Sequence, residues 1–93
     1  VYTNTGQYLK ALQVLSPALS LHRQTGDTKG EAATLTSIGI VYTKTGQSLK
    51  ALENHARALS LHRQRGDRNG EAATLTNIGV VYSDTGQPQK ALE

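Results

Sequence analysis

Hydrophobic residues recur along this chain at the spacing of one face of an α-helix. The same apolar stripe lies in segments 28–44 and 68–84, at Leu35, Ile38, Gly39 and Tyr42 and again at Leu75, Ile78, Gly79 and Tyr82. Steps of three, one and three residues place these positions on one side of a helix. The pattern therefore predicts one helix over 28–44 and another over 68–84.

A second stripe occupies segments 7–24 and 47–64. Its members are Ala11, Leu12, Leu15, Ala18, Leu19 and His22 in the first segment and Ala51, Leu52, His55, Ala58, Leu59 and His62 in the second. Pro17 lies inside the first segment, where its ring removes one backbone hydrogen bond. Because the stripe continues past Pro17, we predict a kink between Gln13 and Pro17 and no break.

The chain repeats itself with a period of forty residues. Residues 1–53 laid over residues 41–93 agree at roughly 70% of positions without a gap, which indicates a repeat architecture. We expect a single array fragment over 1–93. It would comprise the end of a first helix (1–6), a second helix (7–24), one full repeat (28–44 and 47–64) and a truncated next repeat (68–84 and 87–93).

Turn residues separate the predicted helices. Gly26 and Gly66 suit the left-handed end of a helix, and Asp27 and Asp67 follow as N-caps of the next one. The sequence TGQ at 5–7, 45–47 and 85–87 predicts the other turn, and Pro88 suits a first helical position. Two antiparallel helices per repeat result.

These signatures resemble the tetratricopeptide repeat. The residues that carry the resemblance are Leu35, Gly39, Tyr42, Gly46, Ala51 and Ala58, with Leu75, Gly79, Tyr82, Gly86 and Ala91 in the next copy. The forty-residue period is similar to the subclass in Pins/LGN-type scaffolds and bacterial arrays. The resemblance implies an all-α, right-handed α-solenoid of antiparallel helix pairs, whose concave groove holds a peptide or a partner's helix. His55 departs from the family pattern, which places a large aromatic or aliphatic residue there.

After the cap region, the two copies of the first helix differ on one face only. The changed pairs are Ser37 and Asn77, Ile40 and Val80, Thr43 and Ser83, and Lys44 and Asp84, and the unchanged Thr36 and Thr76 lie beside them. At about 100° per residue this face lies opposite the apolar stripe. We predict that these ten residues line the groove and contact the ligand. The alternative is that an exposed face varies because nothing packs on it.

A second candidate surface is a basic edge of Arg63, Arg65 and Arg68. It would suit an acidic partner or a phosphate. The alternative is that cations near the end of a helix complement its dipole.

Composition narrows the function classes. A net charge of +3 spread along the chain gives little reason to expect nucleic acid as a partner, and no Cys agrees with a reducing compartment, from which we expect a cytoplasmic protein. The longest apolar run, IGIVY at 38–42, is too short to cross a membrane. The sequence has no catalytic motif and no converging metal ligands, so we expect no enzyme, no cofactor and no metal. The function favoured is a protein-binding scaffold, and the alternative is a spacer that positions an effector domain elsewhere in a longer chain. The apolar Leu9, Leu12 and Leu92 also suggest end-to-end self-association.

Overall fold

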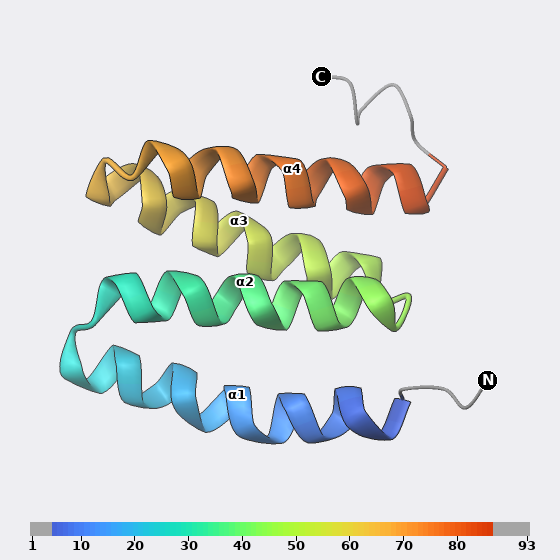
Figure 1. Cartoon of the computed structure of the whole chain (residues 1–93), viewed down its shortest axis with the longest axis horizontal. Coiled ribbons are helices and arrows are strands. Elements are labelled where there is room, and N and C mark those ends of the chain that lie inside the picture. Colours follow the sequence, from blue (N-terminus) through green and yellow to red (C-terminus); the bar gives the residue numbers. More distant parts are fainter. Residues whose placement is uncertain (1–4, 87–93) are drawn as a thin grey trace.

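The computed structural model describes residues 5–86, which form four α-helices joined by short turns (Figure 1). The helices are α1 (Thr5–Thr25), α2 (Thr28–Lys44), α3 (Ser48–Arg65) and α4 (Arg68–Asp84). Consecutive helices run antiparallel, so α2 and α4 point the same way (Figure 1). The described residues contain no strand, and the prediction of an all-α helical repeat is confirmed. Segment 87–93, with Pro88, Ala91 and Leu92, and residues 1–4 lie outside the described residues.

Helix α2 is the centre of the packing. It contacts α1, α3 and α4, while α3 also packs against α4. The buried apolar side chains are Ala32, Leu35, Ile38 and Val41 of α2, Ala51 and Ala58 of α3, and Val81 of α4. Ala51 and Ala58 have no exposed surface, as expected where small residues let helix backbones approach closely.

Equivalent residues of the two copies differ in burial. Leu35 is fully buried, whereas Leu75, in an identical local sequence, is 46% exposed. Helix α2 has three neighbours, but α4 contacts only α2 and α3 within the described part of the chain. In a repeat array each unit is buried by its neighbours, so one sequence gives different burial at different positions.

Two turns of the sequence Gly-Asp, at residues 26–27 and 66–67, join α1 to α2 and α3 to α4. Gly26 and Gly66 have φ angles of 71° and 69°, in the left-handed region. This conformation lets the amide of Asp27 donate to the carbonyl of His22, and the amide of Asp67 to that of His62, each at 2.9 Å. We call these two segments the Gly-Asp turns.

The three TGQ sequences do not behave alike. Gly46 and Gly86 both have a φ of 78° and end α2 and α4, as predicted. The turn predicted at 5–7 is wrong, because Thr5 and Gly6 already belong to the first turn of α1. Helix α1 continues through Pro17 without a break.

The left-handed glycine gives a first prediction. We expect Gly66→Ala to lower the free energy of unfolding by about 1 kcal/mol, since a Cβ disfavours a positive φ. Nothing lies within 4 Å of the position of that Cβ, so the loss would come from the backbone alone. Urea unfolding followed by circular dichroism measures it.

The control is Gly66→Asn, because Asn tolerates the left-handed region better than Ala. It should lose less stability than the Ala variant. Equal losses in the two variants would contradict the backbone explanation.

Candidate functional site

A cavity of about 390 Å³ lies between α2 and α4. We call it the α2–α4 cavity, and its lining consists of Ile40, Thr43 and Lys44 from α2, His55 from α3, and Asn77, Val80 and Asp84 from α4. Since α2 and α4 are parallel copies of one helix, equivalent positions face the cavity from both sides. These are the pairs Ile40 and Val80, and Lys44 and Asp84.

Six of the ten predicted contact residues therefore line one cavity. They are Ile40, Thr43, Lys44, Asn77, Val80 and Asp84, whereas Thr36, Ser37, Thr76 and Ser83 are not part of the lining. Ile40 and Val80 are 41% and 47% exposed, so each offers apolar surface to a ligand. That the ten residues contact a ligand stays a prediction.

Hydroxyl groups on this face turn back to their own helix. Thr36, Thr43 and Thr76 donate to the carbonyls four residues earlier, at 3.0, 2.9 and 3.0 Å. Ser37 does the same towards Ala33 at 3.2 Å. Because these hydroxyls are already paired, the Thr side chains can offer their methyl groups to a ligand.

The cavity changes charge from one side to the other. Lys44 and Asp84 hold equivalent positions at the C-terminal ends of α2 and α4. The α2 side therefore carries a positive charge and the α4 side a negative one. The repeat pattern does not fix the charge at this position, because it is one of the positions at which α2 and α4 differ.

His55 is the lining residue that the predicted site omitted. Its side chain has no exposed surface, and its ring lies against Gly39: a Cβ built on Gly39 would come within 2.5 Å of the His55 Cε1 atom. The sequence signal that could point to His55 is the difference between α3 and α1, because α1 has Leu15 at the equivalent position. From the sequence alone, this difference indicates only a change in packing.

The electrostatic state of His55 follows from its burial. Neither Nδ1 nor Nε2 has a hydrogen-bond partner among the described residues. Burial lowers the pKa of the imidazole below its ordinary value of 6.5, because the charged form loses hydration. The ring is therefore neutral at pH 7.

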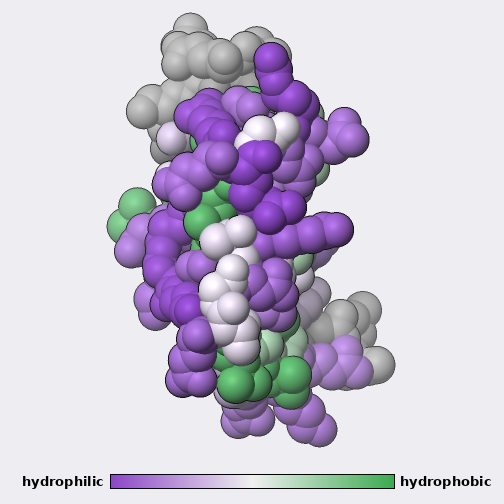
Figure 2. Space-filling model, turned by 90° about the vertical axis from the view of Figure 1, so that its left-hand side faces the viewer, coloured by the Kyte–Doolittle hydropathy of each residue, from purple (hydrophilic) through white to green (hydrophobic). Residues whose placement is uncertain are grey.

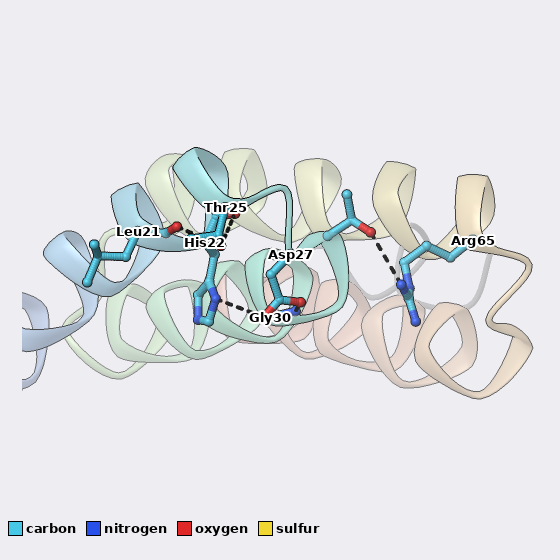
Figure 3. Close-up of polar contacts among 7 residues, drawn as sticks. Leu21, His22, Thr25, Asp27, Gly30 and Arg65 are labelled. Atoms are coloured by element: carbon cyan, nitrogen blue, oxygen red, sulfur yellow. Dashed lines mark hydrogen bonds and ion pairs between the residues drawn. The ribbon is translucent and has the colours of Figure 1, made fainter.

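The Gly-Asp turns bring charged residues together in the same way in both repeats, and Figure 3 shows the first of these turns. The Asp27 carboxylate accepts from the Gly30 amide at 2.9 Å, and its other oxygen lies 3.2 Å from His22 Nδ1. In the second turn, Asp67 accepts from Gly70 at 2.9 Å and lies 3.4 Å from His62 Nδ1. The backbone amide is the main cause that lowers the pKa of each Asp below 3.8.

The predicted basic edge lies at these turns. Arg63 pairs with Glu71 at 3.0 Å, as Arg23 pairs with Glu31 in the first copy. Arg65 donates to Thr28 Oγ1 at 3.3 Å, which links the two turns (Figure 3). Arg68 is exposed at the start of α4. Two of the three cations thus have internal contacts, and their role in binding a partner stays a prediction.

The surface over the turns is mainly hydrophilic, with hydrophobic side chains gathered near its lower end (Figure 2). No group of three metal-binding side chains occurs among residues 5–86. None of the four described helices combines the length and the apolar character needed to cross a membrane.

A second prediction concerns the contact between Gly39 and His55. We expect Gly39→Ala to lower the free energy of unfolding by about 1–3 kcal/mol, because its methyl group overlaps a fully buried ring. Chemical denaturation measures the loss.

The double variant Gly39→Ala, His55→Ala tests the cause. Removing the ring makes room for the methyl group, so the two substitutions should be less harmful together than the sum of their separate effects. Simple additivity would show that the ring is not what excludes a side chain at position 39.

A third prediction concerns pH. The unfolded chain binds a proton at His55 near pH 6.5, and the folded chain binds it only at lower pH. Stability should therefore fall as the pH drops from about 7.5 to 5.5, by at most about 1.4 kcal/mol per pH unit from this residue. Urea unfolding at several pH values measures it.

His55→Leu is the matched control, since α1 carries Leu at the equivalent position. His22 and His62 remain in both proteins, so the difference between the two pH profiles reports His55. The pKa values of Asp27 and Asp67 are lowered in the folded chain. The stability that these two residues contribute is therefore lost only below about pH 4, outside this window. Parallel profiles would contradict the prediction.

The sequence model of one family matches this chain. The family is described as tetratricopeptide repeat, and its model matches residues 1–64 and again residues 30–93, so the two matches together cover every residue. No curated protein and no solved structure gives a significant match.

Proposed function

This chain belongs to the tetratricopeptide repeat family, and from that membership we propose that the α2–α4 cavity binds a peptide segment of a partner protein. Members of the family generally mediate protein–protein interactions and are typically non-enzymatic scaffolds. The observation that carries the proposal is that six of the eight residues at which α2 and α4 differ beyond their first turn line the cavity. Differences that lie around one cavity alter what it can bind, whereas differences scattered over the surface do not.

The apolar contacts come from Ile40 and Val80. These two side chains face the cavity from opposite sides and keep 41% and 47% of their surface exposed. An apolar side chain of the peptide would cover both, and the removal of this surface from water favours binding. Because helices hold both residues in place, the groove needs little ordering when the peptide enters.

The charges fix the direction of the peptide. A segment that crosses from α2 to α4 meets Lys44 first and Asp84 second. An acidic residue on the α2 side and a basic residue on the α4 side would complement both. The reverse orientation would bring like charges together, so the cavity also disfavours a peptide that runs the other way.

A selection experiment gives the fourth prediction. A phage library of random nine-residue peptides is selected on this protein, and the peptides are then measured against Ile40→Ala, Val80→Ala by fluorescence anisotropy. Loss of the apolar walls should weaken binding about tenfold, since both side chains lose the surface that the peptide would bury. Circular dichroism verifies that the variant is folded.

The control exchanges the two residues between copies, as Ile40→Val, Val80→Ile. It keeps the apolar surface and should change the affinity less than threefold. If binding of no selected peptide depends on these residues, the proposed peptide groove is wrong. The alternative function, a spacer for an effector domain, is then favoured. The molar mass in solution, measured alongside, tests the predicted end-to-end self-association.

A further inference from the structure

His55 is a polar residue at a position that the preceding repeat fills with Leu15. The ring borders the α2–α4 cavity, lies against Gly39 and has no exposed surface. It is the one residue of α3 in the lining of the cavity. A hydrocarbon side chain would fill this place without burying a polar atom.

Both ring nitrogens of His55 lack a hydrogen-bond partner among the described residues. A neutral imidazole has one N–H donor and one nitrogen acceptor, and buried groups of this kind are nearly always paired. In the lining, Ile40 and Val80 are apolar and Thr43 is paired with Gly39, while the polar Lys44, Asn77 and Asp84 make no hydrogen bond to the ring. A group that enters the cavity can supply the missing partner.

We propose, building on the peptide groove above, that His55 selects a peptide residue with a hydroxyl group, threonine above all, in the α2–α4 cavity. A hydroxyl both donates and accepts, so it can pair with whichever ring nitrogen faces the cavity. The methyl group of threonine would contact Ile40 and Val80. Ile40, Lys44 and Asp84 line the cavity and are exposed, and rotation of their side chains would give the hydroxyl access to the ring.

Charged side chains fit this place poorly. Beside the neutral and fully buried ring, a carboxylate or an ammonium group would lose its hydration without gaining an opposite charge. A purely apolar side chain would leave the ring without a partner. A site that hydrogen-bonds a hydroxyl discriminates strongly against the analogue that lacks it, because its own polar group is then left unpaired.

The test uses a selected nine-residue peptide whose binding depends on Ile40 and Val80. Each threonine in it is replaced in turn by valine, which has the same shape, and each serine by alanine. One replacement should weaken binding to the wild-type protein about tenfold. The same replacement should change binding to His55→Leu less than twofold, because that variant has no ring nitrogen to pair.

His55→Gln keeps a neutral group that can donate and accept, and it should retain part of the preference for the hydroxyl. In the wild-type protein, the ¹⁵N resonances of the His55 ring should shift with the original peptide and not with the valine peptide. Their absence from the spectrum of His55→Leu assigns them. A role in packing alone would change stability in both variants and leave the preference unaltered.

Three outcomes are distinct. If groove-dependent peptides carry no hydroxyl residue, or if the replacement costs the same on wild type and His55→Leu, the proposal for His55 fails and the groove stands. If no peptide depends on Ile40 and Val80, the groove fails and the proposal for His55 fails with it. A peptide whose hydroxyl matters only when His55 is present supports both.

Discussion

Each Gly-Asp turn depends on one aspartate that serves two helices at once. The amide of Asp27 closes the end of α1, while its carboxylate accepts from Gly30 and caps the start of α2. Its second oxygen faces His22 at 3.2 Å. With the glycine before it in the left-handed conformation, the residue sets how one helix follows the other. Since Asp67 repeats these contacts, both helix pairs have the same turn. The turn at Gly46 reverses the chain between the two pairs, so α2 and α4 run parallel.

Close helix contact is the second constraint. Ala51 and Ala58 are fully buried, and Gly39 leaves room for the His55 ring. A side chain of any size at position 39 would overlap that ring. The small residues therefore hold α3 against α2 and, in the same way, place an imidazole beside the cavity. The contact between Gly39 and His55 thus belongs both to the helix packing and to the candidate site.

The arrangement of the helices decides which sequence differences between the two copies can affect binding. The helical face that varies between α2 and α4 was predictable from the sequence, because residues at known spacing share a side of a helix. That six of its ten residues meet around one cavity required the distance between α2 and α4. Positions 36, 37, 76 and 83 lie on the same face but outside the lining. A helical wheel fixes the direction of a side chain around its own axis and not its distance from the next helix.

The sequence by itself determined the helices, the Gly-Asp turns and the family, because periodicity, caps and left-handed glycines act over a few residues of chain. Tertiary structure alone decided that Leu35 is buried while Leu75 is 46% exposed, since burial depends on which helices are neighbours. It also decided the place of His55. Only the packing of α3 between α2 and α4 brings this ring, unpaired on both nitrogens, to Gly39 and to the edge of the cavity.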